Sequence, residues 1–403
     1  MDLEFSAAEK AFRAEARAWL RAHVPARPLP SLETAEGFAA HRAWERELYA
    51  GGWSAVSWPR ELGGRGASLT EWLIFEEEYY AAGAAGRVSQ NGINLLAPTL
   101  FAHGTEEQLA RILPPMAAGQ TIWAQAWSEP EAGSDLAALR SRAERTGQYG
   151  GGWLLYGHKT WSSRAAFADR AFGLFRTDPE AERHRGLSYL MFPLDAPGVT
   201  VRPIGRLDGK PAFAEIFLDA VFVPDADVIG EPGDGWRAAM STAGNERGLT
   251  LRSPGRFTAA AERLRRLWRE RAAADDTALA GRVADAWIRA RAYQLAGYAA
   301  ASAASAAPRA AADSPRGERK TDAGPAAFAS SLNKIFWSEL DIDLHETALD
   351  LLGPGAGEIT EGGPGAEWLD GWVFALAGPV YAGTNEIQRD IVAERVLGLP
   401  RGR

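Results

Sequence analysis

The chain has 403 residues, of which 46% are apolar and 24% charged, and its formal net charge is −8 at pH 7. This length and apolar content provide a large core that can be divided among two or three packed units. The acidic balance gives no support to nucleic-acid binding. The absence of cysteine excludes disulfides, cysteine-ligated zinc and a cysteine nucleophile.

The N-terminus carries acids among its first residues, and Phe5, Phe12 and Trp19 recur at helical spacing. This pattern argues against a signal peptide, which has a basic start and a continuous apolar run. No stretch of about 18 uncharged apolar residues occurs anywhere, so nothing in the chain predicts a membrane span. We therefore expect a cytoplasmic protein that does not enter a membrane.

Residues 1–120 predict a helical domain. Apolar residues recur at three- and four-residue spacing through Phe12–Leu20 and Trp72–Tyr80, with segments rich in proline and glycine between them. The acidic run Glu76–Glu78 indicates a solvated edge of the second helix. Thr105, followed by two acids, is typical of an N-cap and marks the start of another helix.

Between residues 121 and 229 the apolar period changes from 3.6 to 2, in short segments separated by Gly, Pro and Asp. Short strands at this spacing predict a small β-barrel or sandwich inserted between helical units. From residue 230 to 403 the pattern is helical again. We therefore expect an α+β fold that is mainly α, with an N-terminal helical domain (1–120), a small middle β-barrel domain (121–229) and a C-terminal helical domain (230–403).

The C-terminal stretch VYAGTNEIQRDIVAERVLGLP joins a tight turn to a helix. Gly383 supplies backbone freedom and Thr384 is a candidate N-cap. Glu386 lies in the first turn, where the helix dipole favours an acid. The N–H groups that converge at such a helix start can bind an anionic or carbonyl oxygen. An isolated surface helix with a cap would show the same letters, so this stretch alone leaves both interpretations open.

Two further stretches in the middle of the chain carry candidate site residues. AWSEPEAGSDLAAL (Ala126–Leu139) contains turn-forming residues and by itself predicts a loop between a helix and a strand. GHKTWSS (Gly157–Ser163) predicts an alternating strand, in which a tryptophan is normally a core residue.

A third stretch, MSTAGNERGLTLR, predicts a helix that places Glu246 on the same face as three small residues, Ala239, Ala243 and Thr250. Small side chains around an acid leave room for a ligand. An ordinary solvated pair of Glu246 and Arg247 would produce the same pattern, and the sequence alone favours that simpler interpretation.

Taken together, these stretches resemble the signatures of the acyl-CoA dehydrogenase family. The C-terminal stretch is similar to YEGTxxIQRxIxAR/E, and the two middle stretches are similar to TEPxAGSD followed by GxKxWxS/T. His103–Gly119 resembles GTxEQKxxxLPxLxxG, and Ile229–Trp236 resembles the linker out of the β-domain. The resemblance covers essentially the whole chain. It implies that the C-terminal domain is a four-helix bundle. It also implies FAD-dependent α,β-dehydrogenation of an acyl thioester, carried by coenzyme A or by an acyl-carrier protein.

The resemblance also implies which residues hold the flavin. Trp127 and Ser128 would contact the isoalloxazine edge. Trp161 would pack on the ring, and Ser163 would reach the N5 region. An apolar wall with a few donors is suited to fix a flavin ring and to tune its electronic properties.

Further contacts with FAD follow from the same resemblance. Gly133 and Ser134 would lie toward the substrate and the pyrophosphate arm. Thr384 and Glu386 would touch FAD, as would the backbone of Asp350–Gly353 reaching from a neighbouring subunit.

The chain departs from the family pattern at the position of the base. Many members have the catalytic glutamate directly before the Gly-Thr pair, where this chain has Ala382. Some branches, including isovaleryl-CoA dehydrogenase, place the base in an E-R pair on the mid-chain helix, and Glu246 with Ala382 reproduces that combination. We therefore expect Glu246 to take the α-proton while the β-hydride passes to flavin N5. The backbone N–H of Ala382, with a ribityl hydroxyl, would stabilise the thioester oxygen.

Other features are implied by the resemblance as well. The substrate would contact Ser134, Ala243, Arg247, Tyr381 and Gly383. Electrons would pass to an electron-transferring flavoprotein, and the chain would form a homodimer or homotetramer, or part of a heteromer. Two other functions on the same fold stay open: a flavin oxidase or monooxygenase that uses O₂, and a non-catalytic subunit of a heteromer. We expect no metal site.

Overall fold

The structure is a computed structural model, which describes residues 4–247, 249, 252–271, 276–306, 325–354 and 365–400. The chain folds into two units. We call the first the helical unit, composed of Met1–Val24, Ala67–Ala84 and Arg247–Arg403, and the second the sheet unit, composed of Pro25–Gly66 and Ala85–Glu246. The sequence-based boundaries at 1–120, 121–229 and 230–403 stay a prediction.

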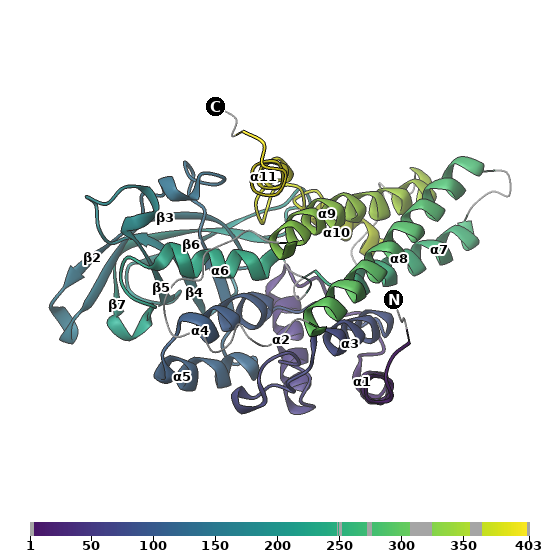
Figure 1. The fold of residues 1–403 in the computed structure, drawn as a ribbon, viewed down its shortest axis with the longest axis horizontal. Helices are drawn as coiled ribbons and strands as arrows, with labels where there is room; N and C mark the ends of the chain where they lie inside the picture. The colour runs from purple at the N-terminus through teal and green to yellow at the C-terminus, as the bar shows by residue number, and fades with distance from the viewer. Residues whose placement is uncertain are drawn as a thin grey trace. The chain divides into compact units, whose positions relative to one another are not determined.

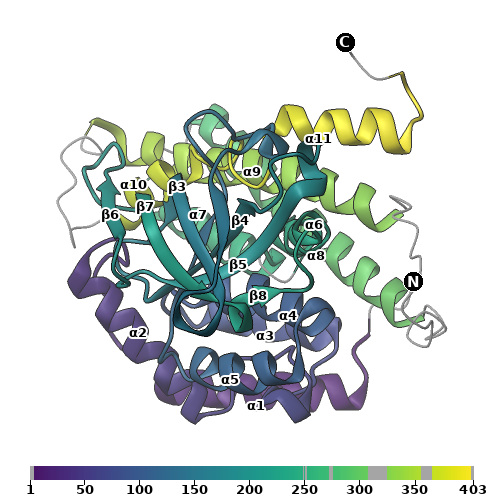
Figure 2. The same cartoon turned by 90° about the vertical axis from the view of Figure 1, so that its left-hand side faces the viewer.

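The sheet unit is built on an eight-stranded mixed sheet. Its hydrogen-bonded order is β6-β7-β3-β2-β4-β5-β8, and β1 pairs in parallel with β4. Figure 2 looks onto this sheet, with β6 and β7 on one side and β5 and β8 on the other. The strands are β1 (Trp123–Ala126), β2 (Arg142–Thr146), β3 (Gly152–Ser163), β4 (Arg170–Arg176), β5 (Leu187–Pro193), β6 (Val199–Ile204), β7 (Phe213–Pro224) and β8 (Val228–Ile229).

The long strands β3 and β7 pair antiparallel, and the register shifts between Lys159 and Ser162 near the end of β3. A bulge of this kind bends a strand and re-aims the side chain inside it. The two residues inside this bulge are Thr160 and Trp161. The alternating period predicted for this part of the chain is therefore interrupted at a residue that the family resemblance assigns to the flavin.

Four helices accompany the sheet within its unit. The N-cap expected at Thr105 is present, and it forms a capping box, because its hydroxyl accepts from the Gln108 N–H while the Gln108 side chain accepts from the Thr105 N–H. A side chain at Gly235, the first residue of α6, would lie 2.4 Å from the backbone of Ser188 on β5. Only glycine therefore lets α6 approach β5, and Figure 1 shows the two elements side by side. These helices are α2 (Ala35–Ala50), α4 (Ala97–His103), α5 (Glu106–Ala117) and α6 (Gly235–Arg247).

The helical unit contains a bundle of four helices, in which α7, α8 and α9 pack on one another and α10 packs on α9. Its core includes Leu264, Ala290, Trp337, Leu340 and Leu344. The fold class expected from the sequence is thus confirmed. The helices are α1 (Ala7–His23), α3 (Leu69–Ala81), α7 (Pro254–Arg271), α8 (Thr277–Ala306), α9 (Pro325–Leu352), α10 (Ala366–Ala375) and α11 (Asn385–Ile391). In the described segments, no helix is long and apolar enough to cross a bilayer.

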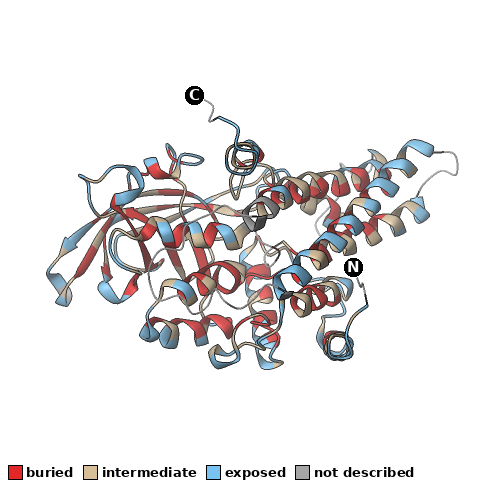
Figure 3. Cartoon of the chain, viewed as in Figure 1, coloured by how far each residue is buried: buried red, intermediate tan, exposed pale blue. Residues whose placement is uncertain are grey.

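The prediction of a solvated acidic edge on α3 is wrong for two of its three residues. Glu76 and Glu78 are buried, because α3 is enclosed by α1, α7 and α8 within the helical unit. Glu76 accepts a hydrogen bond from Ser253 at 2.9 Å, and Glu78 accepts one from Arg17 at 2.7 Å. Figure 3 shows how buried residues follow the inward faces of the helices. The spacing of apolar residues in α3 does not reveal that three other helices pack against it.

The contact between α9 and α10 generates a stability prediction. A Cβ at Gly371 would lie 2.2 Å from Nε2 of His345, whose buried ring is fixed by a 2.7 Å hydrogen bond between Nδ1 and the Asp341 carbonyl. Because the ring has no room to withdraw, Gly371→Ala is expected to lower the free energy of unfolding by about 1–3 kcal/mol, measured by urea denaturation.

A matched control is available in α8. A Cβ at Gly281 would meet no atom of the described residues within 4 Å. Gly281→Ala is therefore expected to be neutral or to stabilise by about 0.4–1 kcal/mol. Equal stability of the two variants would contradict the proposed clash.

Candidate active site

The end of β1 carries the first pair of predicted site residues, Trp127 and Ser128, both half-buried. The Ser128 carbonyl accepts a 2.9 Å hydrogen bond from the Thr160 N–H, which ties this segment to β3. The indole N–H of Trp127 donates to the Tyr189 hydroxyl on β5 at 2.9 Å. The two strands on either side thereby fix the backbone and the ring orientation of the segment that the resemblance assigns to the flavin edge.

A buried ion pair holds the loop that follows. The fully buried Lys159 of β3 donates to Glu129 at 2.8 Å and to the Leu174 carbonyl at 2.8 Å. Glu129 also accepts from the backbone N–H groups of Arg140 at 2.6 Å and Ser141 at 2.9 Å. Burial alone would raise the pKa of Glu129, but the Lys159 charge and these N–H donors hold it below its ordinary value. The ionised carboxylate therefore fastens both ends of this loop.

Sequence reasoning missed Glu129 and Lys159 as residues that support the site. The signal was available, since a lysine inside an alternating strand has to be paired if it is buried, and an acid stands in the preceding loop. Which acid pairs with which base depends on how β3 lies against the loop, and the position of β3 is set by its pairing with the neighbouring strands of the sheet.

Trp161 has an unusual position at the bulge of β3. Its φ is 59° and 60% of its surface is exposed, although Thr160 and Ser162 on either side are buried. A positive φ in a bulky residue costs on the order of 1–3 kcal/mol and persists only where the surroundings impose it. The result is an aromatic face presented outward at the end of the strand. Ser163 follows it and is half-buried.

A chain of hydroxyl groups leads from Trp127 into the sheet unit. The Tyr189 hydroxyl, which accepts from Trp127, lies 3.4 Å from Oγ1 of Thr242 on α6. Oγ1 of Thr242 lies 2.7 Å from Oγ1 of Thr99, which donates to the Leu95 carbonyl at 2.7 Å. The Trp127 indole donates at one end of this chain, the Thr99 hydroxyl donates to the Leu95 carbonyl at the other, and the Thr242 hydroxyl also donates to the Ala238 carbonyl at 3.1 Å. These contacts hold α6 against β5.

Glu246 lies on the same face of α6 as Thr242, in the last turn of the helix, and is half-buried. Burial raises the pKa of Tyr189 well above its ordinary value, and the negative charge of Glu246 raises it further. The Glu246 carboxylate therefore acts on the hydroxyl that Trp127 binds. Ala239 and Ala243, on the preceding turns of this face, are both buried. Thr250 and the side chain of Arg247 lie outside the described residues.

In the helical unit, the turn before α11 contains two consecutive residues with positive φ, Ala382 at 57° and Gly383 at 77°. The Gln388 side-chain amide donates to the carbonyls of Ala382 at 3.0 Å and Gly383 at 3.3 Å. Because the C=O and N–H of a trans peptide point in opposite directions, the N–H groups of Gly383 and Thr384 point away from Gln388. Thr384 caps α11 as expected, since its hydroxyl accepts from the Ile387 N–H at 3.2 Å.

The flanks of this turn differ in polarity. Glu386 is exposed, and the backbone N–H at the helix start and the Thr384 hydroxyl lower its pKa. On the other side, the Tyr381 ring stacks on Trp337 with 5.9 Å between centroids. The Arg252 guanidinium lies 5.2 Å from the centroid of each of these two rings.

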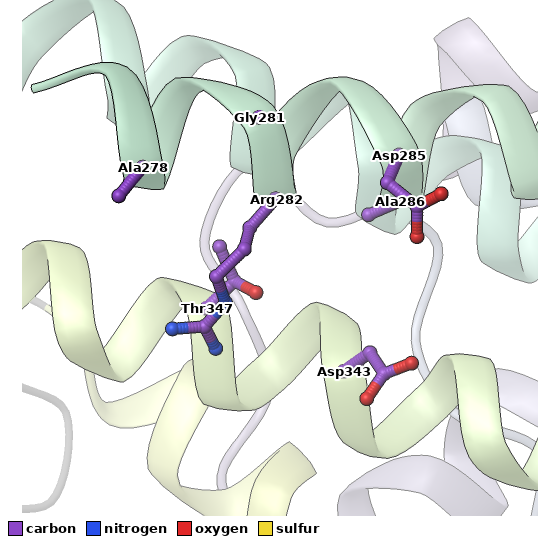
Figure 4. A pocket seen from close by; sticks show the side chains of 7 residues that line it. All are labelled: Ala278, Gly281, Arg282, Asp285, Ala286, Asp343 and Thr347. Carbon is purple, nitrogen blue, oxygen red and sulfur yellow. The ribbon is translucent and has the colours of Figure 1, made fainter.

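Two groups of predicted residues lie apart from these clusters. Gly133 and Ser134 are exposed in the loop after Glu129. Asp350, near the end of α9, pairs with Arg282 of α8, and Gly353 ends the helix with φ 68°. Figure 4 shows a pocket of about 460 Å³ between α8 and α9, into which Arg282 reaches. It is lined by Ala278, Gly281, Arg282, Asp285, Ala286, Asp343 and Thr347.

The buried pair in the sheet unit generates the next prediction. Lys159→Met leaves the Glu129 carboxylate buried without its cation, so we expect the free energy of unfolding to fall by about 3–5 kcal/mol in urea denaturation. The double variant Lys159→Met with Glu129→Gln is expected to recover part of this loss. The exposed pair of Arg142 and Glu144 provides the control, because Glu144→Gln should cost less than about 1 kcal/mol. Equal losses at the two pairs would refute the supporting role of Lys159.

The chain matches three domain descriptions of one family in order. Acyl-CoA dehydrogenase, N-terminal domain, matches residues 6–120; the middle domain matches residues 124–221; and the C-terminal domain matches residues 233–397. The chain is 39% identical over 401 residues to acyl-CoA dehydrogenase IpdE1 of Mycobacterium tuberculosis, covering 97% of each chain. It is 35% identical over 358 residues to acyl-CoA dehydrogenase FadE26 of the same organism, covering 87% of this chain and 86% of that protein.

Two solved structures show the same similarity. The Tcur3481-Tcur3483 steroid ACAD has a TM-score of 0.81 with 28% identity, covering 100% of both chains. The ChsE4-ChsE5 complex from Mycobacterium tuberculosis has a TM-score of 0.80 with 29% identity, covering 100% of both chains. These matches define a class of protein, the flavoprotein oxidoreductases that act on CH–CH bonds of acyl thioesters. The chain belongs to the acyl-CoA dehydrogenase family.

Proposed function

We propose that this protein is an FAD-dependent acyl-thioester dehydrogenase in which Glu246 removes the α-proton. The observation that carries the proposal is the place of Glu246 on α6, where it is half-buried and one helical turn after Thr242. The Thr242 hydroxyl lies 3.4 Å from the Tyr189 hydroxyl, which accepts from Trp127. The helix face that carries the proposed base thus contacts a side chain that binds a residue of the proposed flavin site.

The residues of the sheet unit fit a flavin. The exposed indole of Trp161 presents a flat apolar face, and the backbone of Trp127 and Ser128 is fixed between two strands. FAD, when bound, supplies the acceptor for the β-hydride. The other residues proposed to hold it are Ser163, Gly133 and Ser134, with Thr384 and Glu386 at the start of α11 and Asp350–Gly353 from a neighbouring subunit.

Three side chains, Tyr189, Thr242 and Glu246, are the candidates for the base that removes the α-proton. Tyr189 stays protonated, because its pKa is raised, and Thr242 is a hydroxyl held in the same chain of hydrogen bonds. Of these three side chains, only Glu246 is a base at neutral pH. Glu246, which is half-buried, follows Ala239 and Ala243 on the same face of α6, and we propose that these small side chains border the acyl chain. We propose that the α-proton passes to a carboxylate oxygen of Glu246.

Ala382 has no carboxylate side chain, and we propose that it acts through its backbone N–H. Its N–H would donate to the thioester oxygen, which raises the acidity of the α-carbon. Gln388, by holding the carbonyls of Ala382 and Gly383, keeps the turn in one conformation before substrate arrives. Tyr381 and Gly383 would line the substrate on either side of this N–H. Ser134, Ala243 and Arg247 complete the proposed substrate contacts.

The base assignment gives a direct test. Glu246→Gln keeps the shape of the side chain and removes its basicity, so kcat is expected to fall by about 10²–10⁴ while flavin content stays as in the wild type. The measurement is anaerobic bleaching of the flavin by a panel of acyl-CoA thioesters, from straight-chain to polycyclic. The exposed Glu231→Gln is the control and should bleach at the wild-type rate. Undiminished bleaching by Glu246→Gln would refute the assignment.

We also propose a bulky acyl group and an electron-transferring flavoprotein as electron acceptor. The small residues Ala239 and Ala243 beside Glu246 support the first proposal, as does the similarity to a structure named a steroid ACAD. Preferential bleaching by polycyclic thioesters would support it further. Slow reoxidation of the bleached flavin by air would favour the flavoprotein acceptor, whereas rapid O₂ consumption would indicate an oxidase.

A second candidate function is that of a non-catalytic subunit in a heteromer. Ala382 in place of the usual glutamate favours it, and so does the similarity to the ChsE4-ChsE5 complex. If the chain is a complete enzyme, it should purify alone with flavin and bleach with a thioester. The alternative predicts a flavin-free, inert protein that gains both properties with a second chain of this family, and whose activity in that complex is unaffected by Glu246→Gln.

A further inference from the structure

We propose that Lys334 is a positioning residue that closes the turn Pro379–Asn385 and so fixes the Ala382 N–H toward the thioester oxygen. This inference rests on the proposed function of that turn. Lys334 lies on α9 and is fully buried. The family signatures quoted above do not include it, and the sequence offered no reason to connect it with residues 45–51 positions further along the chain.

The ammonium group binds both ends of the turn. Nζ of Lys334 donates to the Pro379 carbonyl at 3.0 Å and to Oδ1 of Asn385 at 2.8 Å. The Pro379 carbonyl also accepts from the Asn385 N–H at 2.9 Å, so the same two residues are joined directly. Hydrogen bonds from an ionised donor are roughly twice as strong as neutral ones. One buried charge thus closes a turn of seven residues.

A second residue of α9 supports this closure. The Ser338 hydroxyl, one helical turn after Lys334, contacts Oδ1 of Asn385 at 3.1 Å and the Ile335 carbonyl at 2.9 Å, and its single proton is shared between these two acceptors. Ser338 is fully buried and Asn385 is nearly so. The Asn385 amide donates to Glu339 of the same helix at 3.5 Å. Together with Lys334, these contacts hold the Asn385 side chain against α9, and α11 begins at that residue. The position of the turn is set by a long helix rather than by the turn itself.

The turn requires such external support. Ala382 has a φ of 57°, a conformation that costs on the order of 1–3 kcal/mol in a residue other than glycine. The N–H groups of Ala382, Gly383 and Thr384 have no acceptor among the described residues, so hydrogen bonds from these three groups do not stabilise the turn. Gln388 holds two of its carbonyls from inside. Lys334 holds its ends, and the three N–H groups stay available to a ligand.

The charge of Lys334 has a second consequence. The pKa of Glu386 is lowered by the N–H at the helix start and the Thr384 hydroxyl, and the positive charges of Arg389 and Lys334 add to this shift. The buried ammonium group therefore favours negative charge at the start of α11. An oxygen bound by the Ala382 N–H becomes negative as the α-proton leaves, and the same charge favours it. Lys334 thus orients the Ala382 N–H and stabilises the negative charge that develops on the oxygen bound to it.

The test measures two quantities: the hydrogen–deuterium exchange of the turn, and the rate at which the α-proton of a thioester is exchanged. Lys334→Met is expected to accelerate hydrogen–deuterium exchange of the peptide spanning residues 376–386, measured by mass spectrometry on the flavin-loaded protein. A 3-thiaacyl-CoA has an acidic α-proton but no hydride to lose at its β position. We expect the variant to incorporate solvent deuterium at its α-carbon about 10²-fold more slowly, because a displacement near 1 Å costs about that factor. In turnover, kcat should fall with KM little changed.

Matched variants separate this role from general destabilisation. Arg17→Met removes a cation from the buried Glu78 in the same unit without altering the printed contacts of the turn, and it should leave exchange of peptide 376–386 as in the wild type. Asn385→Ala removes the shared acceptor and carries the test if Lys334→Met fails to fold. Asn385→Asp keeps an acceptor for Lys334 but pairs its charge, so relative to Asn385→Ala it should restore the protection of the turn and only part of the rate of deuterium incorporation.

Two results would overturn the proposal: unchanged exchange of the turn in Lys334→Met and Asn385→Ala, or faster exchange with unchanged deuterium incorporation at the α-carbon. If the wild type incorporates no deuterium into any thioester, the proposed function fails and the positioning role fails with it. The exchange comparison still decides in that case whether Lys334 closes the turn.

Discussion

The ion pair of Glu129 and Lys159 is the contact on which the sheet-unit part of the site depends. It joins the loop after Ser128 to the interior of β3. Removing either charge would leave the other one buried without a partner. Trp127 and Ser128 lie directly before that loop, and the bulge that carries Trp161 lies directly after Lys159. One buried charge pair thus fixes, from two sides, the segments that would contact a flavin ring.

The helical unit uses a similar device with different chemistry. Lys334 is also fully buried and also ends at a turn with functional residues, but its hydrogen bonds to Pro379 and Asn385 go to neutral oxygens. Lys159 fixes the loop of the proposed flavin site through Glu129. Lys334 fixes the turn that carries the Ala382 N–H, and its positive charge adds to the lowering of the Glu386 pKa at the start of α11.

The proposed position of the base on α6, rather than in the turn at Ala382, agrees with the structure of both segments. The turn retains what a backbone donor needs: two residues with positive φ, carbonyls held by Gln388 and no acidic side chain at position 382. Helix α6 provides what a base needs: a half-buried carboxylate on the face of Thr242 and Tyr189, with small side chains before it.

The sequence by itself determined the order of helical and β segments, the cap at Thr105 and the N-cap at Thr384, because these depend on residue period and on contacts a few positions apart. It did not determine that Glu76 and Glu78 are buried, that Lys159 pairs with Glu129, that Trp161 lies in a bulge, or that Lys334 closes a turn far along the chain. Each of these depends on which element lies beside which, and the pairing of a buried charge is decided by distance in space, for which sequence separation is no guide.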